Sequence, residues 1–155
     1  MASGPDMHYF HKPVEASPLP AGVEFLALPE FLADEPACRT LWELLDTQFR
    51  TRSKFLSIWP SVRFICLHRN GEGSADGFLL VSAPVNWQID YVVVRPESRG
   101  QGIAGTILKA ALGQAYLHGA PYVMLTCKES LRSLYESCGF TAISEVPSSK
   151  FRVPT

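Results

Sequence analysis

The stretch VVVRPESRGQGIAG, which runs from Val92 to Gly105, carries the strongest structural signal in this sequence. It begins with β-branched residues typical of a strand, passes through a charged turn and ends in GQGIAG, which matches the pattern G-x-G-x-x-G. A glycine-rich loop that leads into a helix presents unpaired backbone N–H groups and the positive end of the helix dipole, and both favour a diphosphate. Arg99 adds a positive charge where the loop begins. The stretch therefore predicts a strand, an anion-binding loop and a helix, with a simple tight turn as the alternative.

The same glycine pattern occurs in nicotinamide-dinucleotide folds, but three features argue against that ligand. The residues Arg95 to Arg99 separate the strand from the glycines, whereas in those folds the glycine turn follows the strand almost at once. The acidic residue that would hold a ribose is missing at the usual distance, where Tyr122 to Leu125 stand, and Glu129 comes late. The glycines also lie deep in the chain, after a hairpin. A different diphosphate ligand is therefore favoured.

Length and composition are those of one globular domain, since the 155 residues are 46% hydrophobic and 19% charged. The formal net charge of −1 offers no basic surplus for nucleic acid or anionic lipid. No apolar run is long enough for a signal peptide or a membrane span, so we expect a cytoplasmic protein without a membrane partner. Neither the cysteines nor the histidines are spaced like metal ligands, so we expect free thiols and no metal site; these residues are Cys38, Cys66, Cys127, Cys138, His8, His11, His68 and His118.

The pattern along the chain predicts a mixed α/β fold with an antiparallel hairpin and at least one crossover. We expect residues 1–22 to form a flexible N-terminal segment and residues 23–155 to form a single domain. Asp34 can cap the first long helix, and Gly119 followed by Pro121 can end the second. The predicted strands are 22–28, 61–69, 77–85, 88–94, 122–127 and 140–146; the predicted helices are 33–49, 102–118 and 130–138, with an irregular or short helical piece over 49–60 and a hairpin turn over 70–76.

Two motifs resemble those of the GCN5-related N-acetyltransferase (GNAT) superfamily. Its coenzyme A signature has the core [QR]-x-x-G-x-[GA], whose defined positions are filled here by Arg99, Gly102 and Ala104. LRSLYESCGF resembles the family's later piece that ends in L-Y-x-x-x-G-F, with Tyr135, Gly139 and Phe140 at the matching positions. The resemblance extends from Gly77 to Val146. It implies the acyl-CoA N-acyltransferase fold, which is a mixed, mostly antiparallel central sheet flanked by helices.

The resemblance also implies acetyl-CoA as the cosubstrate, in a gap where a central strand splays from its neighbour. Backbone groups of Val92, Val93 and Val94 would pair with the pantetheine arm as with an added strand. The diphosphate would bind the loop, which consists of Arg99, Gly100, Gln101, Gly102, Ile103, Ala104 and Gly105. Lys128 stands where many relatives have an asparagine that contacts the cofactor. Because lysine accepts no hydrogen bond, that contact is either lost or becomes ionic.

Two residues are candidates for proton transfer. Tyr135 matches the family's general acid, since a phenol stays protonated at neutral pH and can donate a proton to the leaving thiolate. Its alternative role is packing of the helix on the sheet. Asp90 is the candidate base, and strict strand alternation puts it on the face of Val92 and Val94, opposite Ile89, Tyr91 and Val93. A carboxylate that only bonds to a neighbouring group is the alternative for Asp90.

The acceptor is expected to be a primary amine of a small molecule or peptide, and its identity is open. The stretch FRTRSKF carries Arg50, Arg52 and Lys54 between Phe49 and Phe55, which suits either a carboxylate-bearing amine or a solvated face. Trp59 and Trp87 are read as core residues, with an acceptor pocket as the alternative. A non-catalytic acyl-CoA-binding module is the rival function, and a homodimer is an option because relatives often dimerise.

Overall fold

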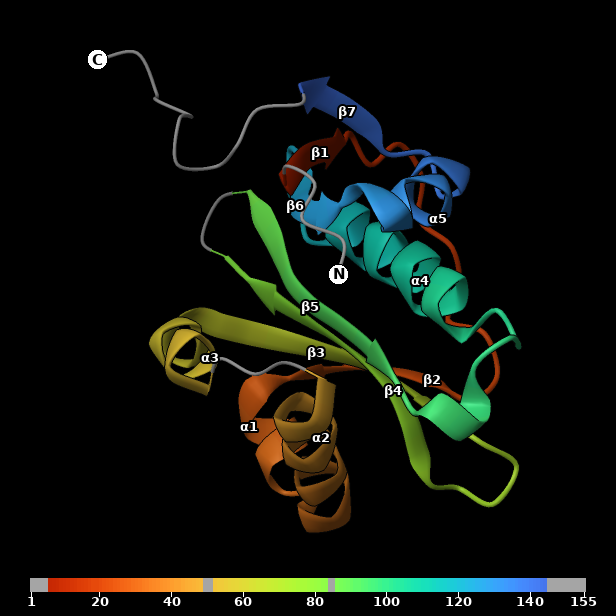
Figure 1. The fold of residues 1–155 in the computed structure, drawn as a ribbon. Helices are drawn as coiled ribbons and strands as arrows, with labels where there is room; N and C mark the ends of the chain where they lie inside the picture. The colour runs from red at the N-terminus through yellow and green to blue at the C-terminus, as the bar shows by residue number, and fades with distance from the viewer. Residues whose placement is uncertain (1–5, 49–51, 84–85, 145–155) are drawn as a thin grey trace.

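A computed structural model of the chain describes residues 6–48, 52–83 and 86–144 (Figure 1). In the described residues, the strands form one sheet with the order β2-β3-β4-β5-β6-β1-β7. All registered neighbours in this sheet are antiparallel except β5 and β6, which are parallel. The elements are β1 (Asp6–His11), β2 (Val23–Ala27), α1 (Leu28–Leu32), α2 (Glu35–Gln48), α3 (Arg52–Ile58), β3 (Val62–Arg69), β4 (Ala75–Ser82), β5 (Trp87–Val94), α4 (Ile103–Leu117), β6 (Val123–Lys128), α5 (Arg132–Ser137) and β7 (Thr141–Ser144).

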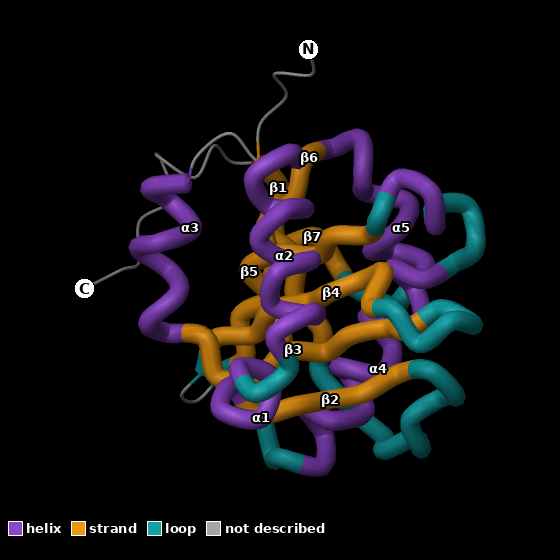
Figure 2. Tube along the Cα trace, turned by 90° about the horizontal axis from the view of Figure 1, so that it is seen from below, coloured by secondary structure: helices purple, strands orange, loops and turns teal. Residues whose placement is uncertain are grey.

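Helices cover both faces of the sheet. The helices α1, α2 and α3 lie on one face and α4 and α5 on the other, and Figure 2 views the molecule from the side of α1 and α2. Two hydrophobic clusters result. The α2-side core includes Leu41, Phe78 and Tyr91, and the α4-side core includes Leu79 and Ile107. Since neighbouring residues of β4 alternate between these cores, β4 is buried along almost its whole length, as expected for a central strand.

The helix ends and the hairpin turn predicted from the sequence are confirmed. The Asp34 carboxylate accepts a hydrogen bond from the Ala37 N–H at 3.1 Å, which caps α2. Gly119, with φ of 74°, follows the end of α4 in the left-handed conformation. In the β3–β4 turn, the Asn70 side chain accepts bonds from the N–H groups of Glu72 and Ser74.

The prediction of a flexible segment over residues 1–22 is wrong for Asp6–His11. These residues form β1, which pairs with both β6 and β7 inside the sheet. Tyr9 of this strand is fully buried. The pairing partners are more than a hundred residues away in the chain, so local sequence patterns carried no sign of this strand. The short helix α1 was also missed, because the sequence pattern extended the preceding strand to Leu28.

Candidate active site

The sheet opens between β5 and β6. These parallel strands are in register only from Trp87 to Ile89 on β5, opposite Val123 to Leu125 on β6. Beyond Ile89 the register between β5 and β6 does not continue in the described part of the chain. An extended segment with amide groups can pair with an open strand edge as an added strand does. Val92, Val93 and Val94 lie on this open part of β5.

The glycine loop begins a few residues after the open end of β5. After a short turn at Pro96–Ser98, Gly100 and Gly102 take φ angles of 82° and 75°, which are left-handed conformations that favour glycine. A Cβ atom added at Gly100, Gly102 or Gly105 would meet no other atom within 4 Å. The amides of Ile103, the first residue of α4, and of its neighbours begin a helix and have no acceptor within it. The loop is therefore an open cradle of N–H groups that suits an anion.

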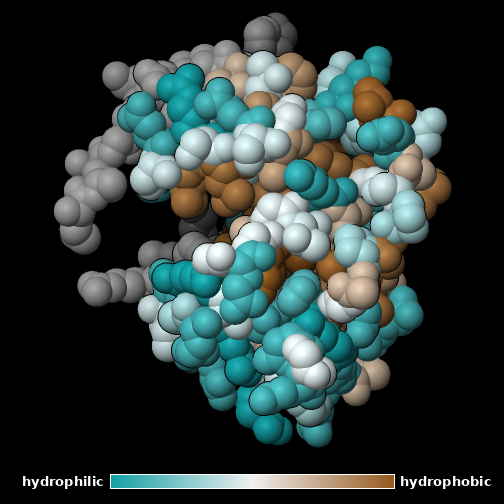
Figure 3. Space-filling model, turned by 90° about the vertical axis from the view of Figure 1, so that its right-hand side faces the viewer, coloured by the Kyte–Doolittle hydropathy of each residue, from teal (hydrophilic) through white to brown (hydrophobic). Residues whose placement is uncertain are grey.

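Arg99 supplies a positive charge beside this loop, and the helix that follows the loop packs tightly on the sheet. Arg99 is exposed, and no described carboxylate forms an ion pair with it. The start of α4 packs tightly on the sheet, because a Cβ atom at Gly77 would lie only 2.7 Å from Cγ2 of Ile103. Gly77 was not singled out from the sequence, where one glycine near a strand end gives little signal. Figure 3 views the molecule from the right-hand side of Figure 1, where hydrophobic residues are visible between the hydrophilic regions above and below them.

Asp90 is the extra residue of a β-bulge on β5. Leu80 of β4 pairs with Tyr91, whereas the next residue, Val81, pairs with Ile89. The bulge moves Ile89 into the α4-side core, while Tyr91 and Val93 lie in the α2-side core. The predicted placement of Ile89 on the same face as Tyr91 and Val93 is therefore wrong, because it assumed unbroken alternation.

The environment of Asp90 favours its neutral form. Burial raises the pKa of the Asp90 carboxyl to about 6, although hydrogen bonds with the hydroxyl and the N–H of Ser82 lower it. Its Oδ2 atom is buried and has no hydrogen-bond partner among the described residues. A half-buried carboxyl with a pKa near neutrality and an oxygen without a partner is suited to proton transfer. Ser82 was not singled out from the sequence, because only the fold brings it beside Asp90.

Tyr135 lies on α5 and is buried in the α4-side core. Its ring packs against those of Tyr9 and Phe140, with centroid distances of 6.3 and 6.0 Å. Burial raises the pKa of the Tyr135 phenol, and the Cys127 and Cys138 thiols raise it further. The phenol is therefore protonated at neutral pH. Tyr135 lies on α5 and Asp90 on β5. The described structure contains no hydrogen bond between these two residues.

The model of the acetyltransferase (GNAT) family matches residues 28–140, which is well over half of the chain. The chain belongs to the GNAT acetyltransferase family. No curated protein sequence matches it.

Solved structures share the fold of this GNAT protein at low sequence identity. A GCN5-related N-acetyltransferase from Sphaerobacter thermophilus has a TM-score of 0.65 and 20% identity, over 90% of this chain and 49% of that chain. An acetyltransferase from Trypanosoma brucei has a TM-score of 0.62 and 17% identity, over 86% of this chain and 99% of that one. Glucosamine-6-phosphate N-acetyltransferase from Arabidopsis thaliana has a TM-score of 0.56 and 17% identity, over 83% of this chain and 97% of that one. The chain thus spans about half the length of the Sphaerobacter protein.

The remaining predicted site residues of this GNAT protein lie around the open edge or outside it. Lys128 is exposed at the end of β6 and pairs in register with Asp6 of β1. Trp87 is buried in the α4-side core and Trp59 packs against the α2-side core, so both serve as core residues. Phe55 is also buried. Phe49 and the side chains of Arg50, Arg52 and Lys54 lie outside the described residues.

Two further observations concern other kinds of site in this GNAT protein. Within residues 6–48, 52–83 and 86–144, no cluster of His, Cys, Asp or Glu side chains is arranged to hold a metal ion. In the same residues no helix combines the length and the apolar character needed to span a bilayer.

Proposed function

We propose that this protein transfers an acetyl group from acetyl-CoA to a primary amine. The observation that carries this proposal is the path from Val92, Val93 and Val94, which lie beyond the β5–β6 register, to the open glycine loop before α4. One end of this path suits an amide-containing chain and the other suits a diphosphate. Coenzyme A contains both groups in that order. Membership of the acetyltransferase family supports the same cosubstrate.

In this proposal the backbone of Val92, Val93 and Val94 pairs with the pantetheine arm, and the loop from Arg99 to Gly105 binds the diphosphate. This loop includes Gly100, Gln101, Gly102, Ile103 and Ala104, and the space that a Cβ atom would occupy at its glycines is open. Arg99 supplies the positive charge that a diphosphate requires. Lys128, at the end of β6, would contribute an ionic contact to the cofactor.

Asp90 and Tyr135 would divide the proton transfers. An ammonium group has no lone pair, so Asp90 takes a proton from the acceptor before its nitrogen attacks the thioester carbonyl carbon. The new C–N bond forms, and the C–S bond breaks as the carbonyl is restored. The raised pKa of Tyr135 keeps its phenol protonated, so that it can donate a proton to the departing thiolate. The nitrogen loses its second proton as the amide forms, and this proton restores the Tyr135 phenol through solvent. A backbone N–H near Val92 would stabilise the oxyanion that develops on the carbonyl.

Calorimetric titration of the purified protein with acetyl-CoA tests the first part of this proposal, with free CoA and NADH as parallel controls. Saturable binding of acetyl-CoA, with no heat from NADH, is the expected result. A panel of amines is then tested for release of the CoA thiol. Binding without thiol release from any amine would favour a non-catalytic acyl-CoA-binding module. Absence of acetyl-CoA binding would mean that the glycine loop forms only a tight turn and binds no cofactor.

The four cysteines also agree with action in a reducing compartment such as the cytoplasm. Cys38, Cys66, Cys127 and Cys138 are free thiols, and three of them are buried. Burial raises the pKa of the Cys66 thiol to about 12, so this residue is an unreactive core side chain.

A further inference from the structure

Arg63 and Asp90 occupy matching irregularities on the two sides of β4. On β3, Val62 pairs with Ser82 while Phe64 pairs with Val81, so Arg63 is the extra residue of a bulge. Asp90 is the extra residue of the bulge on β5, beside the same Val81. Since neighbouring strands are about 4.8 Å apart, the two bulges lie about 10 Å from each other across β4. The positively charged Arg63 and the negatively charged Asp90 therefore lie on opposite sides of β4, at the same position along this strand.

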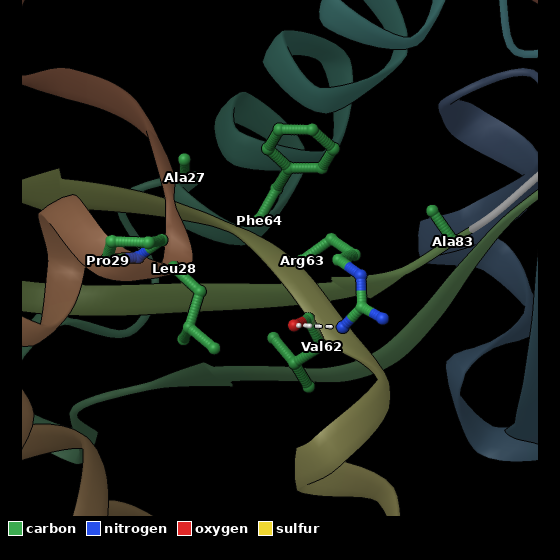
Figure 4. A pocket seen from close by; sticks show the side chains of 7 residues that line it. All are labelled: Ala27, Leu28, Pro29, Val62, Arg63, Phe64 and Ala83. Atoms are coloured by element: carbon green, nitrogen blue, oxygen red, sulfur yellow. Dashed lines mark hydrogen bonds between the residues drawn. The ribbon is translucent and has the colours of Figure 1, made fainter.

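A cavity of about 570 Å³ adjoins the Arg63 bulge (Figure 4). It lies where β2 passes into α1, beside the start of β3 and the end of β4. Its apolar wall consists of Ala27, Leu28, Pro29, Val62, Phe64 and Ala83. The Phe64 ring in this wall is held in place by stacking on Phe25 and Trp87, at centroid distances of 5.0 and 5.1 Å.

The cavity is connected to Asp90 through Ser82. This serine precedes Ala83 of the wall and pairs in register with Val62, another wall residue. Its hydroxyl and N–H bond to the Asp90 carboxylate. Ser82 therefore links the wall of the cavity, through its neighbours Ala83 and Val62, to the Asp90 carboxyl.

Arg63 is the charged residue of the cavity, and its charge is not neutralised by the described residues. Its Nη1 atom donates to the carbonyl oxygens of Pro60 and Val62 at 3.0 and 3.2 Å. No described carboxylate lies within ion-pair distance, in contrast to Arg69, which pairs with Glu24 and Asp34. A guanidinium has five N–H donors in a planar fork that suits an oxyanion. In Figure 4 the Arg63 side chain extends from β3 toward Ala83, along the cavity.

We propose that the acceptor amine also carries an anionic group, which binds Arg63 while the apolar part of the acceptor occupies the cavity beside Asp90. This inference rests on the proposed acetyl transfer and names the chemical class of its acceptor. Carboxylates and phosphates share the required oxyanion chemistry. The apolar wall adds a preference for an acceptor whose body is hydrophobic, such as an amino acid with an apolar side chain.

Matched pairs of amines test the inference. L-phenylalanine is compared with L-phenylalaninamide, and O-phosphotyramine with tyramine, by the rate of thiol release from acetyl-CoA. We expect kcat/KM to be about 10-fold or more higher for one anionic member, because charge-assisted hydrogen bonds contribute this much. The pair that shows the preference identifies the anion as carboxylate or phosphate. Equal rates within both pairs would overturn the inference and leave acetyl transfer intact.

Variants of Arg63 locate the effect. Arg63→Gln should remove the preference by raising KM for the anionic amine, whereas Arg63→Lys should retain part of it. The dissociation constant for acetyl-CoA should be the same in all of them, and Lys109→Gln, which removes an exposed charge on α4, is the matched control. A preference that persists in Arg63→Gln contradicts the assignment.

Binding of the reaction product provides a readout that needs no turnover. N-acetyl-L-phenylalanine and its amide are titrated into the protein by ligand-observed NMR. Tighter binding of the acid, lost in Arg63→Gln, supports the anion site even in a chain that transfers nothing. If neither this acid nor N-acetyl-O-phosphotyramine binds better than its neutral partner, the site does not exist. Failure of acetyl-CoA to bind in calorimetry would instead identify the proposed function as the part that fails.

Discussion

Gly77 of β4 and Ile103 of α4 approach so closely that a Cβ atom on Gly77 would lie 2.7 Å from Cγ2 of Ile103. The contact joins the sheet to the first residue of the helix whose N-terminus follows the glycine loop. The position of this loop therefore depends on the absence of a side chain at Gly77 of β4.

Gly77→Ala should displace the start of α4 and lower both stability and cofactor affinity. Overpacking of this kind costs about 1–3 kcal/mol, because the neighbouring side chain or backbone must move. Thermal unfolding and acetyl-CoA titration measure the two effects. Gly71→Ala is the control, since a Cβ atom at Gly71, in the β3–β4 turn, would meet nothing within 4 Å. If both variants behave alike, the close packing of α4 on Gly77 does not position the loop.

Asp90→Asn should stabilise the protein at neutral pH. The pKa of Asp90 is about 6 in the fold against an ordinary value of 3.8 for an aspartic acid, so the folded state binds the proton more tightly than the unfolded state does. Ionisation of Asp90 therefore costs stability, fully so above pH 6, and the cost disappears as the pH falls toward 3.8. The gain in Tm of the variant should be largest near neutral pH and should shrink in acid. Glu72→Gln, which changes an exposed turn carboxylate, should show no such pattern.

The same variant should lose activity. If Asp90 is the base, kcat/KM of the native protein should rise with pH through an apparent pKa near 6, as the carboxyl loses its proton. Asp90→Asn should lower kcat/KM by about 100-fold or more and remove this limb of the pH profile. The profile is measured with saturating acetyl-CoA. A variant that keeps both the rate and the limb would show that another group or water removes the proton.

Tyr135→Phe should reduce kcat by about 100-fold while leaving acetyl-CoA affinity nearly unchanged. The phenylalanine ring preserves the contacts with Tyr9 and Phe140, so the fold should persist. Single-turnover kinetics and calorimetry separate the two quantities. Tyr116→Phe, on the exposed surface of α4, is the matched control. Unchanged turnover would assign Tyr135 to packing alone.

Gly105→Ala should have opposite effects on stability and on binding. Gly105 lies in the first turn of α4, and alanine is favoured over glycine in a helix by about 1 kcal/mol. The added methyl group would enter open space in the native protein, so Tm should rise. It would enter the space proposed for the diphosphate, so acetyl-CoA should bind more weakly. Thermal unfolding with and without acetyl-CoA measures both effects.

A second glycine of the same helix provides the contrast. At Gly113 a Cβ atom would lie 2.8 Å from Oγ and 3.2 Å from the backbone nitrogen of Ser17. Gly113→Ala should therefore lower Tm, because the segment before β2 must shift. It should leave acetyl-CoA affinity unchanged. A gain in stability from both substitutions would mean that Ser17 does not pack on α4.

The sequence predicted the parts of the site that depend on local conformation. The loop at Gly100 and Gly102, the start of α4 and the Asp34 cap are each determined by a few neighbouring residues, and each was found where it was expected. The second half of the fold was predicted well, because hydrophobic runs such as those of β5 and β6 are bounded by turn-forming residues. The short helix α1 gave no comparable signal.

The sequence by itself determined the local conformation of the loop after β5 and the start of α4, because steric limits on φ and helix capping act over a few residues. Only the tertiary structure decided where the strands slip by one residue. The bulges at Arg63 and Asp90 arise from the pairing of β3 and β5 with β4, and β1 depends on partners at the opposite end of the chain. Strand register results from the packing of both faces at once, and no local pattern encodes it. The environment of Asp90, and with it the pKa of its carboxyl, could therefore not be predicted from the sequence.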